Sequence, residues 1–410
     1  MKTICVINTS SSLHSPRVDS ADPGRISTLH PSLAILAAFA VLLLVGCVFA
    51  KAACDTFGPG VALGTVTING LKEASGIAAS RRNPGVLWTH SDGSDGAIHA
   101  VATNGTHLAT FYLNIPVLDT EDIAVGPGPV RGTSYLYVGD IGDKHGRNRV
   151  QVLRIPEPFV DTAWTGNPAS VGFSGVETFT LSYPDGSYDA ESLMLDPMSS
   201  DLFVVTKQDG TARVYRTNLN AIPGGSLVRW SFVTAIPFWL ASGGDISADG
   251  KQIVLRREEY AQAWERSGGE SVGTALARAG RAIPVIGPPV EPNGEGIALL
   301  PNGSGYVTIG EGVNPPIYFF EAQCPSPPRI TLELQDQSVA VGGTATFRVK
   351  AKGYPAPAYR WRLDGKIIAG EKGRTLVLRR VGLGQAGEYR VTASNSSGRA
   401  RSSATLTVSR

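Results

Sequence analysis

The sequence predicts an all-β protein, with a β-propeller of five four-stranded blades followed by a smaller β-sandwich. One short segment occurs five times, as an acidic or small polar pair followed by an aliphatic residue and a small or apolar one. The aliphatic residues are 46, 70, 53 and 51 positions apart. Further strand-like runs follow each copy, as in propeller blades. The copies are Ser75-Gly76-Ile77-Ala78, Glu121-Asp122-Ile123-Ala124, Glu191-Ser192-Leu193-Met194, Gly244-Asp245-Ile246-Ser247 and Glu295-Gly296-Ile297-Ala298.

The last predicted blade lacks one strand. The run 61–68 (VALGTVTI) is strand-like and precedes the first copy of the repeat. Pairing it with the last blade would close the ring and remove two exposed strand edges. Six blades remain an alternative, because the 70-residue interval leaves room for another. The predicted domains are a leader (1–53), the propeller (54–324), a Pro-rich linker (325–328) and the sandwich (329–410).

The leader contains an uncharged apolar run of 18 residues, 33–50, which predicts one N-terminal helix. Three outcomes are open. Ala50-Lys51-Ala52 suits signal-peptide cleavage, an uncleaved run would anchor the chain in a membrane, and Leu44-Val45-Gly46-Cys47 resembles a lipobox that would place a lipid on Cys47. All three export residues 54–410, so the protein is predicted to be secreted or membrane-anchored.

Two of the four cysteines, Cys54 and Cys324, bracket the predicted propeller. Export implies an oxidising compartment, in which disulfides persist. A Cys54–Cys324 bridge would tie the first and last strands of a closed ring, and two unpaired thiols are the alternative.

The net charge of +2 hides an asymmetry. Residues 54–324 hold 18 Lys and Arg against 28 Asp and Glu, whereas residues 325–410 hold 15 against 5. The body is therefore acidic and the tail basic. We expect the tail to bind an anionic envelope polymer or to dock on the acidic body, and we expect no nucleic acid partner.

The tail resembles an immunoglobulin-like domain of the I-set type. Trp361 matches the core tryptophan of that family, and Tyr389, in Ala386-Gly387-Glu388-Tyr389, matches its tyrosine corner. Val349 and Val391 stand where the family has its two cysteines. The resemblance therefore implies a sandwich that is packed rather than cross-linked.

The body resembles a family of secreted bacterial propellers of undefined activity, which is distantly similar to phytase-type esterases. The matching blocks include 73–81 (EASGIAASR), 139–143 (GDIGD) and 189–193 (DAESL). Family members often have Asn after the GDIGD block, where this chain has Lys144. That departure weakens the metal site that the block would otherwise imply.

Charged residues at equivalent positions of the blades should converge on one mouth of the channel. The predicted mouth consists of Glu121, Glu191, Asp245, Glu295, Lys207, Arg256 and Glu311. Converging carboxylates suit Ca²⁺, and Asp140, Asp143 and Glu121 are the candidate metal ligands. A structural role is the alternative for each acid, since acids at strand starts also accept hydrogen bonds from neighbouring blades.

These observations predict an exported ligand-binding or interaction protein with an acidic, Ca²⁺-dependent mouth. A metal-dependent phosphoesterase or esterase is the first alternative, with His90 and Glu191 as candidate catalytic residues and His145 as another candidate base. A non-catalytic scaffold is the second. The GxSxG, HExxH, CxxC and P-loop motifs are absent from the sequence.

Overall fold

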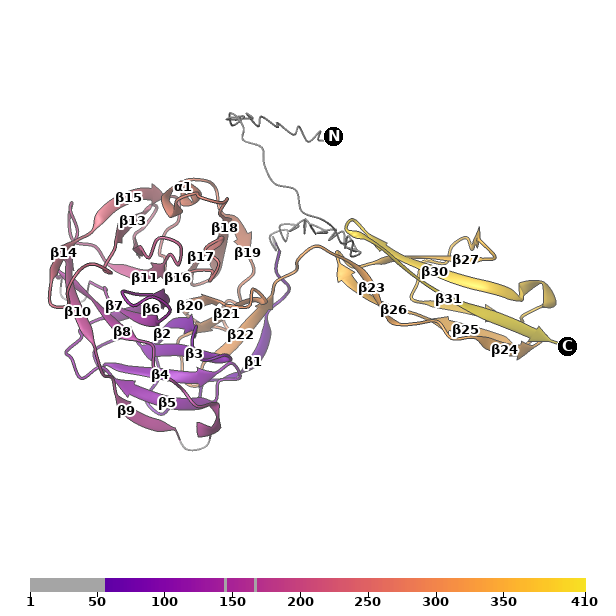
Figure 1. Ribbon diagram of the computed structural model, residues 1–410, viewed down its shortest axis with the longest axis horizontal. Helices are drawn as coiled ribbons and strands as arrows, with labels where there is room; N and C mark the ends of the chain where they lie inside the picture. Colours follow the sequence, from indigo (N-terminus) through magenta and orange to yellow (C-terminus); the bar gives the residue numbers. More distant parts are fainter. Residues whose placement is uncertain (1–55, 144–145, 166–167) are drawn as a thin grey trace, which may run out of the picture. The chain divides into compact units, whose positions relative to one another are not determined.

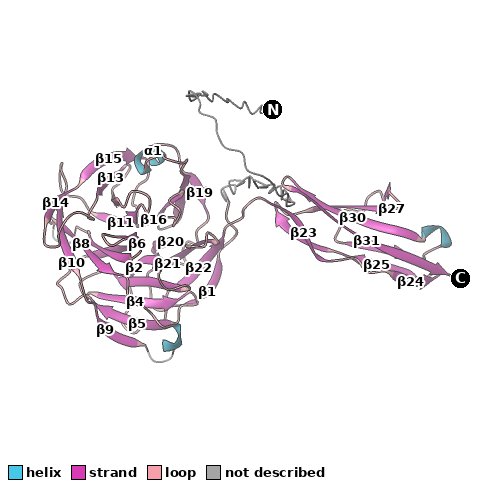
Figure 2. Ribbon diagram, in the orientation of Figure 1, coloured by secondary structure: helices cyan, strands magenta, loops and turns pink. Residues whose placement is uncertain are grey.

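The structure is a computed structural model that describes residues 56–143, 146–165 and 168–410. Strands make up nearly all of its regular structure (Figures 1 and 2). The helical segments among the described residues are short, namely η1 (Thr162–Trp164), α1 (Val272–Leu276) and η2 (Leu383–Gln385). The all-β prediction is therefore confirmed for the described chain.

Residues 61–321 form five sheets of four or five strands, which we call the five-sheet body. Sheet one contains β2 (Ala74–Ala79), β3 (Val86–Ser91), β4 (Ala97–Ala102), β5 (His107–Tyr112) and β9 (Ala169–Gly172). Sheet two contains β6 (Thr120–Pro127), β7 (Ser134–Asp140), β8 (Val150–Pro156), β10 (Glu177–Ser182) and β14 (Leu227–Arg229). Sheet three contains β11 (Ala190–Leu195), β12 (Leu202–Thr206), β13 (Ala212–Thr217) and β15 (Ser231–Ile236).

Sheet four contains β16 (Gly243–Ile246), β17 (Gln252–Arg257), β18 (Tyr260–Glu265) and β19 (Arg281–Ile283). Sheet five contains β20 (Gly294–Leu299), β21 (Gly305–Gly310), β22 (Pro316–Glu321) and β1 (Val61–Thr65). Strand β1 pairs with β22 through Val61 and Phe319, so the predicted pairing of the early run with the last sheet is confirmed.

The five copies of the repeat lie in the first strand of each sheet, β2, β6, β11, β16 and β20. Strand β2 contacts β6 and β20, β6 contacts β11, and β16 contacts both β11 and β20. All side chains of β2 and β11 are buried. Residues at the start of these strands are therefore held in a rigid, water-poor setting.

Strands β9 and β14 each leave the sheet of their neighbours in the sequence and join the preceding sheet. β9 pairs in parallel with β5 of sheet one, and β14 pairs in parallel with β10 of sheet two. β9 lies in the connection between β8 and β10, and β14 in the connection between β13 and β15. Each adds a short outer strand, so an edge that would otherwise expose its backbone groups is covered.

The remaining strands form a sandwich. Its larger sheet has the order β24 (Gln337–Ala340), β31 (Gly398–Ser409), β30 (Gly387–Asn395), β27 (Ala358–Leu363), β28 (Lys366–Ile367). Two further pairs are β25 (Thr344–Arg348) with β29 (Thr375–Arg379), and β23 (Ser326–Leu332) with β26 (Lys350–Tyr354).

The core of the sandwich contains fully buried Trp361, with Val349 and Val391 packed in the same cluster. The Tyr389 hydroxyl donates to the Gln385 carbonyl at 2.9 Å, which is the geometry of a tyrosine corner. Apolar packing therefore takes the place of a disulfide at the centre of this sandwich.

The predicted linker 325–328 differs from the structure, because strand β23 already begins at Ser326. Ser326 pairs with Tyr354, and the register then shifts before Arg329. The shift accommodates Pro327 and Pro328, which have no N–H to donate to a partner strand.

The predicted leader 1–53, with its apolar segment 33–50 and Cys47, lies outside the described residues, as does Cys54. Cys324 is disulfide-bonded. No helix within the described ranges is long and apolar enough to cross a bilayer.

Candidate metal and ligand site

The first strands of four of the five sheets share an irregularity near their start. The register of the first strand shifts between Ala74 and Ile77, Thr120 and Asp122, Ala190 and Ser192, and Gly294 and Gly296. In three of these four shifts the unpaired residue is a glutamate, namely Glu121, Glu191 or Glu295. A β-bulge re-aims the side chain of its extra residue. The bulges therefore turn three equivalent glutamates out of their ladders.

Two of these glutamates belong to a group of five carboxylates, which we call the acid cluster. Oxygens of Asp92, Asp119 and Glu121 lie within 4.8 Å of one another, as do oxygens of Glu121, Asp189 and Glu191. Glu121 is common to both sets. The acids come from the starts of sheets two and three and from the residue after β3.

Burial and mutual repulsion disfavour ionisation in this cluster. Burial, followed by the charges of Glu191 and Asp92, raises the pKa of Glu121 to about 10. Burial raises the pKa of Glu191 to about 7, although Lys207 opposes the rise. Glu295, the third bulged glutamate, is outside the five-residue cluster, but burial and the charge of Glu191 raise its pKa as well, to about 8. The site therefore carries more carboxylates than it can ionise unaided at neutral pH.

Lys207, at the end of β12, supplies one positive charge. Its Nζ lies 2.5 Å from Oε2 of Glu191. Burial lowers the pKa of Lys207, but Glu191, Glu295 and Glu121 raise it by more, so the net shift is upward. One ammonium group thus faces three glutamates.

The GDIGD block (139–143) lies in direct contact with acids of the cluster. A Cβ at Gly142 would collide with the carboxylates of Glu121 and Asp119, so only glycine leaves them room. The backbone N–H of Asp143 donates to Oδ1 of Asp189 at 2.9 Å. The block therefore positions cluster acids through its backbone.

The two acids of the block were predicted metal ligands, and the structure differs from that prediction. Asp140 is fully buried, and its Oδ1 accepts from the Asp119 N–H at 2.9 Å and from Arg147 at 2.7 Å. Asp140 and Asp143 are both outside the carboxylate groups that the described residues form. Asp140 Oδ1 is thus held by Arg147 and by the Asp119 backbone, whereas Asp140 Oδ2 and Asp143 Oδ1 are buried without a hydrogen-bond partner among the described residues.

Asp245 was predicted to be equivalent to the three glutamates, and this was wrong. It is the second residue of its pair, whereas each glutamate is the first, and successive strand residues point in opposite directions. Its Oδ1 accepts from the Ile246 N–H at 2.7 Å and its Oδ2 from the Leu299 N–H at 2.8 Å. Asp245 therefore links β16 to β20 and does not face the cluster.

Asp245→Asn is expected to lower the free energy of unfolding by about 1.5–3 kcal/mol, because an amide cannot accept from both N–H groups and the lost bond is charge-assisted. Chemical denaturation measures this. Cation binding by the folded variant should match that of the wild type, and a variant that lost cation binding at full stability would contradict the structural role.

Arg256 was also predicted at the mouth, but it is fully buried and forms a two-pronged pair with Glu291, at 2.9 and 3.1 Å. Glu311 is half-buried; it accepts from Asn293 at 2.6 Å, and its charge helps raise the pKa of Glu295. Glu311 thus stays near the glutamates, whereas Arg256 is part of the protein interior.

His90 is 1 % exposed, and burial lowers its pKa. Its Nδ1 lies 3.0 Å from the Ser91 carbonyl oxygen. None of the three-ligand groups that the described residues form includes it. The structure therefore does not bring His90 to the acid cluster as a base, and His145 lies outside the described residues.

Three cluster acids, Asp92, Asp119 and Asp189, are not in the predicted mouth or among the three candidate metal ligands. Two of them share a signal, because Asp119-Thr120-Glu121 and Asp189-Ala190-Glu191 both place an aspartate two residues before the bulged glutamate. This Asp-x-Glu pattern was visible in the sequence. Its meaning depends on the bulge, which was not.

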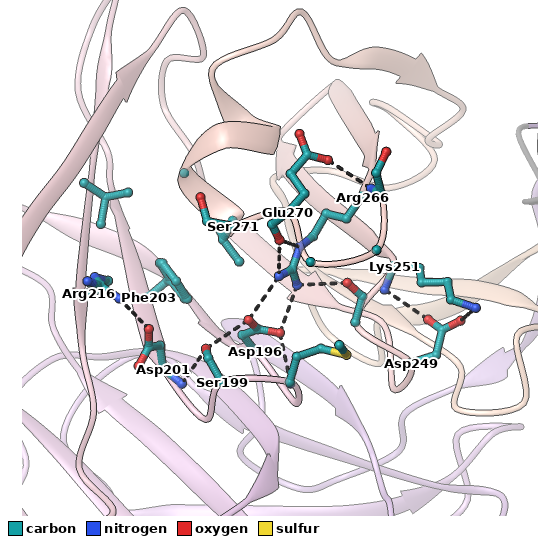
Figure 3. A pocket seen from close by; sticks show the side chains of 18 of the residues that line it. Asp196, Ser199, Asp201, Phe203, Arg216, Asp249, Lys251, Arg266, Glu270 and Ser271 are labelled. Carbon is teal, nitrogen blue, oxygen red and sulfur yellow. Dashed lines mark hydrogen bonds and ion pairs between the residues drawn. The ribbon is translucent and has the colours of Figure 1, made fainter. Parts of the chain in front are cut away.

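A hollow of about 580 Å³ opens near the end of β11, between sheets three and four (Figure 3). Arg266 in this hollow binds both oxygens of Asp196, at 2.9 and 3.2 Å. Arg216 pairs with Asp201 there, and Lys251 with Asp249. The basic groups of this hollow are thus already paired with acids.

Comparison with known proteins bears on the sandwich. A family model described as an immunoglobulin domain matches residues 327–395. This segment is an immunoglobulin-like domain. The Trp361 core and the Tyr389 corner of the immunoglobulin-like domain agree with that match.

The chain is similar to Endoglucanase C of Cellulomonas fimi, at 36% identity over 91 residues that make up 21% of this chain and 8% of the relative. It is also similar to Tyrosine-protein phosphatase Lar of Drosophila melanogaster, at 43% over 56 residues, 14% of this chain and 3% of the relative. The chain thus spans under a tenth of the length of these relatives. The solved structure of titin domain M7 matches at 34% identity and TM-score 0.20, covering 21% of this chain and 96% of that one.

Proposed function

We propose that the five-sheet body is a five-bladed β-propeller, with domain limits near 54–324 and 329–410, and that its acid cluster binds Ca²⁺ and, through it, an extracytoplasmic ligand. The cyclic contacts of the five first strands support the propeller. The apolar run 33–50 and the disulfide at Cys324 support export, since disulfides persist in oxidising compartments.

The observation that carries the proposal is the crowding of five carboxylates around Glu121, one of which, Glu191, is paired with Lys207. Buried like charges at this spacing repel one another unless a cation intervenes. Ca²⁺ accepts six to eight oxygen ligands in flexible geometry, which suits acids drawn from several strands. Any coordination position that the protein leaves open could be taken by a ligand oxygen.

Binding is favoured over hydrolysis by the surroundings of the two candidate catalytic residues. A hydrolase would need a general base beside the metal-bound water. His90 is buried and contacts its own backbone neighbour, and Glu191 is ion-paired with Lys207. We therefore place the metal-dependent esterase second and the passive scaffold third.

The double substitution Glu121→Gln with Glu191→Gln tests the proposal. We expect calorimetric titration with Ca²⁺ to show binding by the wild type and none by the variant. The melting temperature of the cation-free variant should be equal or higher, because two mutually repelling acids are removed.

The matched control is Asp201→Asn with Asp249→Asn, which removes the same number of carboxyl groups elsewhere in the body. The control should bind Ca²⁺ like the wild type. Binding that survives in the cluster variant would refute the site. If the wild type does not bind Ca²⁺ and the melting temperature of the cluster variant is far below that of the wild type, the acids are structural and the scaffold is favoured.

A further inference from the structure

The larger sheet of the immunoglobulin-like domain has one exposed face that is rich in arginine. Side chains alternate along its strands, so that one set packs in the core and the other faces outward. The outward set on β27, β30 and β31 includes Arg360, Arg362, Arg390, Arg399 and Arg401. We call these five residues the arginine face.

The strand register places these arginines side by side. Arg362 is directly opposite Arg390, and Thr392 pairs with both Arg360 and Arg401. Like charges directly opposite each other destabilise a sheet. The domain therefore keeps an unfavourable arrangement on this face, and folding alone does not account for it.

Acidic partners are scarce on the arginine face. Arg390 binds Glu388 at 2.9 Å, and Arg362 donates to the Gly365 carbonyl at 2.7 Å. For Arg360, Arg399 and Arg401, no ion pair or hydrogen bond of the side chain is recorded within the described ranges. Three guanidinium groups are thus available to bind an anion.

The arginine face is hollowed rather than flat. A groove of about 1180 Å³ is lined by all five arginines together with Thr392, Ser394 and Asn395. Neighbouring strands lie about 4.8 Å apart, and alternate residues along a strand are about 7 Å apart. A chain that carries regularly spaced anionic groups could therefore meet several guanidiniums at once.

We propose that the arginine face binds a linear anionic polysaccharide through its sulfate or carboxylate groups. Guanidinium forks bind such groups with two parallel hydrogen bonds, and the hydroxyl and amide side chains of the groove suit sugar hydroxyls. Among the described residues that line the groove, Ile367 is the large apolar side chain that is exposed. The groove therefore offers little apolar surface that could insert into a lipid bilayer. Tyr359 is buried, so the groove lacks an aromatic platform for nucleic acid bases.

The test uses the full chain and the triple substitution Arg360→Gln, Arg399→Gln and Arg401→Gln. The matched control is Arg329→Gln, Arg348→Gln and Arg379→Gln, three exposed arginines on strands outside the larger sheet. Surface-plasmon titration against dextran sulfate and polygalacturonate measures affinity, with phosphatidylserine vesicles as the lipid arm.

We expect at least one polysaccharide to bind the wild type, about tenfold or more weaker binding by the arginine-face variant, and less than about threefold by the control, because charge-assisted bonds are lost only in the former. If both variants lose the same affinity for the polysaccharides, binding depends only on net charge, and the proposal is overturned. Binding to vesicles but to neither polysaccharide would overturn it, as would no binding at all. Equal melting temperatures for the variants and the wild type would exclude misfolding as the cause.

Discussion

Glu291→Gln is expected to lower the free energy of unfolding of the five-sheet body by about 3–5 kcal/mol. Both side chains of the Arg256–Glu291 pair are 0% exposed, so the substitution leaves a guanidinium charge buried without its carboxylate. Arg256 also donates to the carbonyls of Gly296 and Ile309, so it cannot easily turn toward water. Chemical denaturation followed by tryptophan fluorescence measures the loss.

Asp201→Asn is the control, because it removes the acid of a pair whose arginine is 54% exposed. Exposed pairs contribute about 0–1 kcal/mol, so the control should be close to the wild type. The double change Arg256→Met with Glu291→Leu should recover much of the lost stability, since apolar replacement of a buried pair is often neutral. A Glu291→Gln variant as stable as the control would show that the pair is open to water.

Stability of the Ca²⁺-free protein is expected to fall as the pH rises from 5 to 7. The folded state raises the pKa of Glu121 to about 10, of Glu295 to about 8 and of Glu191 to about 7. For acids with a raised pKa, the stabilisation is complete below the unfolded pKa and is lost as the pH approaches the folded value. Glu121 alone should cost about 2–3 kcal/mol over these two pH units.

Thermal melts with a chelator and with saturating Ca²⁺ measure this dependence. Ca²⁺ should restore stability more strongly at pH 7 than at pH 5, because a cation binds the ionised carboxylates and must displace their protons. Glu121→Gln should flatten the profile. A chelated wild type whose stability rises between pH 5 and pH 7 would contradict the crowded, protonated cluster.

Local patterns were sufficient for the immunoglobulin-like domain. Trp361, Tyr389 and the alternating strands are features of one compact sandwich, and each is recognisable within a few residues. The pairing of β1 with β22 was also predictable, because the fifth sheet lacked a strand and one strand-like run remained unassigned. Both inferences used the requirement that strands have partners.

The composition of the candidate site could not be predicted to the same extent. Asp245 and Glu295 both supply the acid of a repeat's leading pair, yet Asp245 accepts backbone N–H groups of its own and a neighbouring strand, whereas Glu295 is turned out by a bulge. A shift of one residue reverses the direction of a side chain on a strand. The sequence does not mark which residue of the pair is bulged.

The sequence by itself determined the strand-rich body, its five repeats, the acidic body and basic tail, and the immunoglobulin-like domain, because periodicity and composition are local properties of the chain. Only the tertiary structure decided which charges meet. It buried Arg256 against Glu291, gathered Asp92, Asp119 and Asp189 around Glu121, and set five arginines on one face. The physical reason is that these neighbours are distant in the chain, and their proximity depends on strand register and on bulges that only the packed sheets fix.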